Sequence, residues 1–98
     1  MGASKMKQSI MPTYKKWSTE YFEGSHKHHI FGGANRKLSE KYGLFVYLTP
    51  AMHNMSNEGI HFNKEFMDYA HKEGQKAYMK HYSSTKEEFI SKFGRNYL

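Results

Sequence analysis

Residues 26–48 read HKHHIFGGANRKLSEKYGLFVYL and contain the pattern that decides the fold. The run from Gly43 to Leu48 is short, apolar and rich in β-formers, and a Thr-Pro pair follows it, which is typical of a buried strand. Residues 28–31 are the natural antiparallel partner of that strand. We expect the polar, glycine-containing connection from Gly32 to Tyr42 to extend outward as a hairpin loop.

A long helix is predicted after these strands. Apolar side chains recur at three- and four-residue spacings from Phe62 to Tyr78, which indicates a helix from near Asn63 to near His81. We expect Asn63 to be the N-cap rather than a catalytic residue, because its short amide can accept from an early backbone N–H. Gly74 weakens such a helix by up to about 1 kcal/mol and permits close packing.

A second, shorter helix is predicted from about Thr85 to Phe93. Ser84 and Glu87 fit a capping box, and Gly94 fits a C-terminal stop. The buried face of this helix would consist of Phe89, Ile90 and Phe93.

The chain length allows one small domain. Of the surface that 98 residues expose when unfolded, roughly 60 to 65% would be buried on folding, so the core is small. Residues 1–12 lack strong periodicity and are predicted to be a flexible arm, and residues 13–98 to be the folded α+β domain. Four aromatic residues near its start are expected to pack on the core rather than to stack on bases: Tyr14, Trp17, Tyr21 and Phe22.

Positive charge is concentrated in the first part of the chain. The net charge is +6, and residues 1–42 carry eight Lys or Arg against three Glu, whereas residues 43–98 carry seven against six acids. A basic surface favours an anionic partner, nucleic acid first, because attraction to phosphates acts before any specific contact. A solvated face that only keeps the protein soluble is the alternative. The candidate nucleic-acid-binding cations are Arg36, Lys37 and Lys41, which lie between the two expected strands.

Composition also excludes some classes of site. The chain has no cysteine, so disulfides and thiolate zinc sites are excluded. No apolar run approaches the length of about 18 residues that spans a bilayer, and no signal-peptide core is visible. We expect a soluble intracellular protein with no membrane partner.

Four histidines form the candidate site. His28 and His29 stand just before Gly32 and Gly33, and His53 and His61 could complete a metal site. One neutral imidazole can take a proton from water near pH 7, another can hold a metal ion, and glycines let a phosphate approach the backbone. These residue types together point to phosphodiester chemistry.

A strand, a polar connection, a strand and then a helix form a ββα arrangement, and this chain resembles the HNH, or ββα-metal, nucleases. Within them it is similar to a small phage and prophage group that includes recombination-associated, RecA-dependent nucleases. The resemblance runs from residue 26 to residue 98. Four segments carry it: HKHHIFGGANRKLSEKYG at 26–43, MHNM at 52–55, GIHFNKE at 59–65 and FGRNYL at 93–98.

The resemblance implies a role for each matching residue. His29, the second of the pair, would be the general base that deprotonates the attacking water, and His28 would be a ligand of one divalent metal ion. His53 and His61 match the later ligand positions, and the residues between them would loop out. The metal would stabilise the scissile phosphate and the departing oxygen, and Arg36 would contact that phosphate. An all-imidazole ligand set suits Zn²⁺ or Ni²⁺ better than Mg²⁺, and the identity of the ion remains open among Zn²⁺, Ni²⁺, Mn²⁺ and Mg²⁺.

Two parts of the family pattern are absent. TPAMH at 49–53 stands where a Cys-x-x-Cys-His segment of a structural zinc would be, so we expect no structural Cys-zinc. Packing by Met52, Trp17 or Tyr21 would replace that zinc. YGL at 42–44 stands where the middle Asn of the signature would be. A hydrogen bond to the second ring nitrogen normally fixes the tautomer of the general base, so the orientation of His29 lacks this support.

The histidine pair also raises a geometrical question. Neighbouring side chains on a flat strand point to opposite faces, so His28 and His29 can share one site only if the strand bends or ends there. In a regular strand one of them would be structural. His71 and His81 are expected at the surface, and His26 in a solvated position before the strand, with phosphate contact or an extended metal site as its alternatives.

These observations predict a metal-dependent DNA endonuclease with a ββα-metal core and a C-terminal helical extension. From the resemblance we expect a phage or prophage protein that acts in the cytoplasm of a bacterial host. DNA would be its partner, with a recombinase filament or another phage or host protein as a further one. The alternative is a phage-derived protein that keeps the scaffold to bind DNA or a protein and cleaves nothing. The intact histidines favour the enzyme, whereas the missing cysteines and Asn favour the binding protein.

Overall fold

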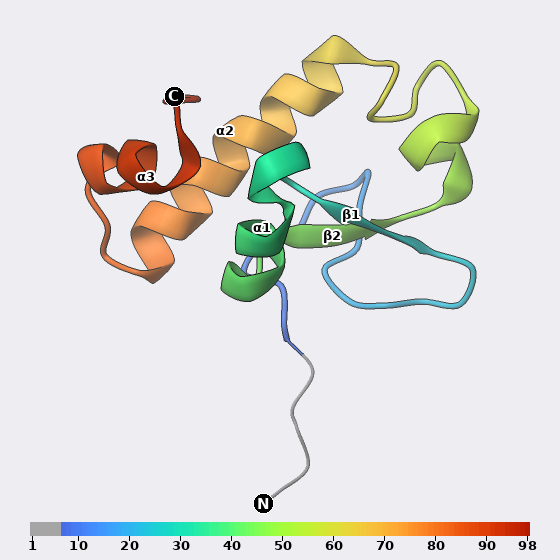
Figure 1. The fold of residues 1–98 in the computed structure, drawn as a ribbon. Helices are drawn as coiled ribbons and strands as arrows, with labels where there is room; N and C mark the ends of the chain where they lie inside the picture. Colours follow the sequence, from blue (N-terminus) through green and yellow to red (C-terminus); the bar gives the residue numbers. More distant parts are fainter. Residues whose placement is uncertain (1–6) are drawn as a thin grey trace, which may run out of the picture.

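Two short antiparallel strands form the sheet of the computed structural model, which describes residues 7–98. Strand β1 (His26–His29) pairs with β2 (Phe45–Leu48). A 3-10 turn η1 (Gly33–Asn35) and helix α1 (Arg36–Tyr42) lie between the strands. After β2 come a π-helical turn η2 (Ala51–Met55) and helices α2 (Lys64–His81) and α3 (Lys86–Phe93). Helix α2 passes behind α1 from the η2 side of the molecule to α3, which gives an α+β architecture (Figure 1).

The two faces of the sheet carry different side chains. Directly paired residues share a face, and the register pairs His28 with Val46 and His29 with Phe45. Val46 and Leu48 belong to the hydrophobic core, so His28 lies on the core face. His29 lies on the opposite face, where its ring is 6.3 Å from that of Phe45.

The predicted strands are partly right. Both exist and pair antiparallel, but β1 covers His26–His29 rather than residues 28–31. Ile30 and Phe31 are each 1% exposed, so two consecutive side chains both enter the core. Strand alternation would send one of them to the other face, and the chain therefore bends directly after His29.

The outward hairpin loop predicted from Gly32 to Tyr42 is wrong, because most of this connection is helix α1. The helix is held to the bend by Ser39, whose buried hydroxyl accepts from the N–H of Phe31 at 3.0 Å and donates to its C=O at 2.8 Å. It ends at Gly43, which has a left-handed φ of +78°. A Cβ at this glycine would lie 2.6 Å from the carbonyl oxygen of Gln8, so any larger residue would displace the neighbouring backbone.

Helix α2 begins where the sequence predicts. The side-chain oxygen of Asn63 accepts from the N–H of Phe66 at 3.0 Å, which confirms the N-cap. The close packing predicted at Gly74 is also confirmed, because a Cβ there would lie 2.7 Å from Cγ2 of Ile30. Helix α2 thus rests directly on the bend that follows β1. In the part of the chain that the structure describes, no helix is both long and apolar enough to cross a membrane.

The start of helix α3 differs from the prediction by one residue. The capping box is formed by Thr85 and Glu88 rather than by Ser84 and Glu87. Its end is confirmed, since Gly94 caps the helix with a φ of +97°. Of the predicted buried face, Phe89 and Phe93 are buried and Ile90 is half-buried.

The segment before β1 packs against the domain. Residues 1–6 of the predicted arm lie outside the described residues, but the next residues do not extend away as a flexible arm would. The N–H of Ile10 donates to the C=O of Gly43 at 2.8 Å, and Met11 is 5% exposed. Trp17 is buried against the ring of Phe66, as expected of a core residue, whereas Tyr21 is 66% exposed.

Candidate metal centre

Three histidines from separate elements converge at one end of the sheet. His28 comes from β1, His53 from η2 and His61 from the turn before α2. One ring nitrogen of each lies within 4.8 Å of the others, and the Nε2 atoms of His53 and His61 are 3.1 Å apart. Two nitrogens bound to one tetrahedral zinc at about 2.05 Å would be about 3.3 Å apart, so this spacing suits a shared metal ion. The three histidines could therefore bind a metal.

His28 is the most informative member of this group. It is 6% exposed, and its Nε2 is buried without a hydrogen-bond partner among the described residues. Burial first, and then the neighbouring histidines His61 and His53, lower the pKa of His28 to about 3. The ring is therefore neutral near pH 7. Buried polar atoms are nearly always paired, and a metal ion would pair this nitrogen.

The backbone explains how ligands eight residues apart come together. The N–H of Ile60 donates to the C=O of Met52 at 2.7 Å, and the N–H of His61 donates to the C=O of His53 at 3.2 Å. Gly59 fits beneath this closure, where a Cβ would lie 2.9 Å from the carbonyl oxygen of Ala51. The residues between the two histidines form a loop that these backbone hydrogen bonds close.

A second titratable group lies on the other face of β1. The Nε2–H of His29 donates to Oε1 of Glu40 at 2.7 Å, and the ammonium of Lys27 contacts the same oxygen at 2.8 Å. The hydrogen bond from Lys27 lowers the pKa of the Glu40 carboxyl, which is therefore an ionised acceptor near pH 7. A carboxylate can only accept, so the proton of neutral His29 is on Nε2 and its Nδ1 has the lone pair.

Glu40 was missed in the sequence because the connection was predicted to be a loop. The signal that could have identified it is its place on helix α1, four residues after Arg36 and so on the same side of that helix. Its hydrogen bond fixes the orientation of the His29 ring.

Both faces of β1 border one hollow of about 370 Å³ beyond the end of the strand. The strand is regular through both histidines, so their side chains lie on opposite faces, yet both reach this hollow. The predicted site residues that line it are His28, His29, His53, His61 and Arg36. Lys37 and Lys41 do not line it.

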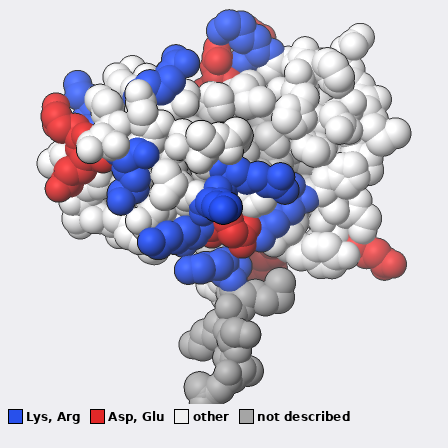
Figure 2. Space-filling model, viewed as in Figure 1, with Lys and Arg blue, Asp and Glu red and all other residues white. Residues whose placement is uncertain are grey.

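The three predicted nucleic-acid-binding cations are all exposed on α1. Only Arg36 borders the hollow, whereas Lys41 lines a separate depression beside Tyr42. Figure 2 shows Lys and Arg atoms gathered around the position of α1 on this face of the molecule. Of the three predicted cations, Arg36 thus lies beside the histidines, and all three are on a helix instead of a loop.

Two other histidines are not where the sequence predicts them. His71 is half-buried rather than at the surface, with its ring stacked at 5.4 Å on Phe31, and burial lowers its pKa. His26 is half-buried rather than solvated, and its Nδ1 lies 3.0 Å from Nδ1 of His53. His81 is exposed, as expected.

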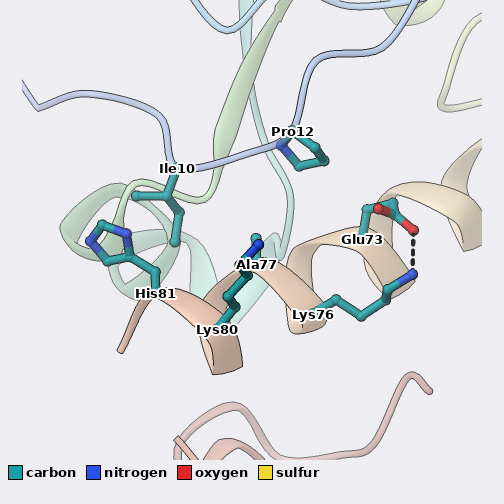
Figure 3. Close-up of a pocket in the computed structure, with 7 residues that line it drawn as sticks. All are labelled: Ile10, Pro12, Glu73, Lys76, Ala77, Lys80 and His81. Atoms are coloured by element: carbon teal, nitrogen blue, oxygen red, sulfur yellow. Dashed lines mark hydrogen bonds and ion pairs between the residues drawn. The ribbon is translucent and has the colours of Figure 1, made fainter. Parts of the chain in front are cut away.

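A larger hollow of about 560 Å³ lies elsewhere, between the segment before β1 and helix α2 (Figure 3). Ile10 and Pro12 form one wall, and the charged pair of Glu73 and Lys76, 3.1 Å apart, stands on α2. The histidine cluster is not part of this hollow, so we place the candidate site in the smaller one.

Comparison of the chain with protein-family models, with curated proteins and with solved structures gives no match. The chemistry of the site is therefore the basis on which a function can be proposed.

Proposed function

We propose that this protein is a metal-dependent DNA endonuclease of the HNH, or ββα-metal, kind. The observation that carries the proposal is the buried Nε2 of His28, which has no partner among the described residues and lies beside His53 and His61. A buried neutral imidazole without a hydrogen bond is costly unless a ligand completes it. A metal-binding role explains why this residue is a histidine.

The donor set fits a divalent ion that accepts nitrogen ligands. His28, His53 and His61 would hold the ion and leave a coordination position for an oxygen ligand. Zn²⁺ and Ni²⁺ suit such a set better than Mg²⁺, which prefers oxygen donors. When bound, the ion would supply positive charge that stabilises the scissile phosphate and the departing oxygen.

Two further side chains, His29 and Arg36, would carry out proton transfer and phosphate binding. Nδ1 of His29 would accept a proton from the attacking water, because the hydrogen bond from Nε2–H to Glu40 selects the tautomer of the neutral ring with its lone pair on Nδ1. Arg36 on the wall of the hollow would bind the phosphate as a fixed cation. The oxygen of the water would form a new bond to phosphorus as the bond between phosphorus and the departing oxygen breaks, and the departing oxygen would take a proton from solvent.

The basic surface around α1 supports a nucleic acid as substrate. Arg36 is exposed on the wall of the hollow, and Lys37 and Lys41 are exposed further along the same helix. Their contacts with phosphates would be largely independent of sequence. A duplex that lies across α1 would bring its backbone to the histidines.

Cleavage of supercoiled plasmid tests this function. We expect the wild-type protein to nick the plasmid in the presence of Zn²⁺, Ni²⁺ or Mn²⁺ and to lose this activity with a chelator. His29→Ala should lower the rate by about 10² to 10⁴, the usual contribution of a general base. His81→Ala is the matched control, because this histidine is exposed and outside the candidate site, and it should cleave like wild type.

The outcomes separate the enzyme from its alternative. A wild-type rate in His29→Ala, at matched metal and pH, would remove His29 from the mechanism. A pure protein that binds DNA but nicks it with none of these metals would favour the binding protein that cleaves nothing.

A further inference from the structure

His53 has histidine neighbours at both of its ring nitrogens. Its Nδ1 lies 3.0 Å from Nδ1 of His26, and its Nε2 lies 3.1 Å from Nε2 of His61. The His26 and His53 rings are nearly perpendicular, with an interplanar angle of 88° and their centroids 5.1 Å apart. If the His53 ring were rotated by 180° about its Cβ–Cγ bond, carbon atoms would replace both nitrogens at these contacts. The two contacts therefore fit only one orientation of the His53 ring.

The two nitrogens of His53 cannot serve the same purpose. A neutral imidazole has one N–H and one lone pair. The Nε2 side faces His61, which with His28 belongs to the three-histidine group, whereas His26 is not a member of that group. A metal ion held by the group takes the lone pair of Nε2, and this leaves the proton of His53 on Nδ1.

His26 is placed to accept that proton. It precedes His28 by two residues on β1, so both side chains lie on the core face of the strand. The strand that supplies one ligand therefore also supplies the hydrogen-bond partner of another. The half-buried position of His26 limits the access of water that could otherwise take its place.

We propose that His26 is a positioning residue of the metal centre, which accepts a hydrogen bond from Nδ1–H of His53 and so fixes Nε2 of His53 as the metal-binding atom. This inference rests on the metal centre of the proposed function, but it does not require that the protein cleaves DNA. Partners of this kind orient the ligand ring and select its tautomer, and their loss typically lowers metal affinity by about 10- to 100-fold.

Zinc affinity of the full chain tests this role. We expect His26→Ala to bind Zn²⁺ about 10- to 100-fold more weakly than wild type in a competition with a chromophoric chelator. His26→Asn should recover most of the loss, because the Asn side-chain oxygen stands close to where Nδ1 of a histidine would and can accept the same bond. His81→Ala is the control and should bind like wild type.

A spectroscopic measurement on the wild-type protein gives a second, independent readout. In long-range proton–nitrogen NMR spectra of the zinc-loaded protein, His53 should have a protonated Nδ1 and a zinc-bound Nε2, with its signals assigned by their absence from His53→Gln. This readout decides the question if His26→Ala fails to fold.

The contrary results are distinct. Wild-type zinc affinity in both folded His26 variants, or zinc bound at Nδ1 of His53, would overturn the role of His26 and leave the nuclease proposal in place. Zinc binding without any DNA cleavage would overturn the nuclease proposal and leave the role of His26 in place. A wild-type protein that binds no zinc would overturn both.

Discussion

The two faces of strand β1 differ in what surrounds their histidines. On the core face, His28 has a buried ring nitrogen with no hydrogen-bond partner in residues 7–98, and two further histidines lie nearby. On the opposite face, His29 is paired with a carboxylate at 2.7 Å, and Lys27 completes that cluster. The first environment presents ring nitrogens that could bind a metal ion, whereas the second already pairs a carboxylate with a cation.

This difference shows how two adjacent residues of one type can have different chemistry. Alternation along a regular strand separates the side chains, and the bend after His29 lets both reach the same hollow. We infer that His28 on the core face would bind the metal ion and that His29 on the other face would accept a proton.

The strongest test replaces the buried histidine. His28→Ala removes a ligand, so zinc affinity should fall by more than the roughly 100-fold that loss of an outer partner can cause. His29→Ala should leave zinc affinity unchanged, because its side chain is on the other face. Competition titration measures both, with circular dichroism as a check on folding. Equal losses in the two variants would abolish the distinction between the faces.

The second test concerns Glu40. Glu40→Gln keeps the size of the side chain but removes the charge that holds the proton on Nε2 of His29, so plasmid cleavage should fall by about 10- to 100-fold. Zinc affinity should not change. Glu87→Gln on α3, where the carboxylate is exposed, is the matched control. A Glu40→Gln protein that cleaves like wild type would show that this carboxylate has no part in orienting the base.

The third test uses acid on the metal-free protein. Burial lowers the pKa of His28 from 6.5 to about 3, so between these values the unfolded chain binds a proton that the folded chain does not. The free energy of unfolding should therefore fall as the pH decreases from about 6.5 toward 3, by up to about 1.4 kcal/mol per pH unit for this group. Burial lowers the pKa of His53 and His71 too, which adds to the slope.

Denaturant unfolding across this range measures the slope. His28→Gln, which has no titrating ring, should flatten it. The opposite trend, a metal-free fold that gains stability on acidification, would contradict a buried neutral His28.

The smallest effect is expected from the basic helix. Removal of Arg36 and Lys37 together should reduce the slope of log affinity against log salt by about one unit for each lost phosphate contact. The His29→Ala background prevents cutting, and Lys80→Ala with Lys86→Ala is a control of equal charge change on α2 and α3. An unchanged slope would exclude this part of α1 as the DNA surface.

Elements with long or strong local patterns were predictable from the sequence. Asn63 and Gly94 mark helix ends through side-chain and backbone chemistry that is local. Helix α1 was not predicted, because seven residues give two turns of periodicity and Gly32 with Gly33 suggests a loop. Its stability comes from Ser39 and the bend after β1, which are contacts that appear only in three dimensions.

The candidate site was predictable to the same extent. The three clustered histidines, His28, His53 and His61, could be identified from residue type and order along the chain, because a family resemblance preserves both. Glu40 and the contact between His26 and His53 do not, because they depend on a helix that was not expected and on which face of a strand each ring occupies. Hydrogen-bond partners of functional residues are set by packing, and sequence spacing alone does not reveal them.

The closed loop between His53 and His61 lets the number of residues between these two histidines increase. Backbone hydrogen bonds join the two ends of the loop, one of them between the ligand residues themselves, while Asn54, Met55, Asn57 and Glu58 are exposed at its tip. The tip can lengthen or shorten without moving either ligand, since a surface loop pays little entropy for added residues. A search for the same site in other chains should therefore allow longer spacings between these histidines and require a small residue at the position of Gly59.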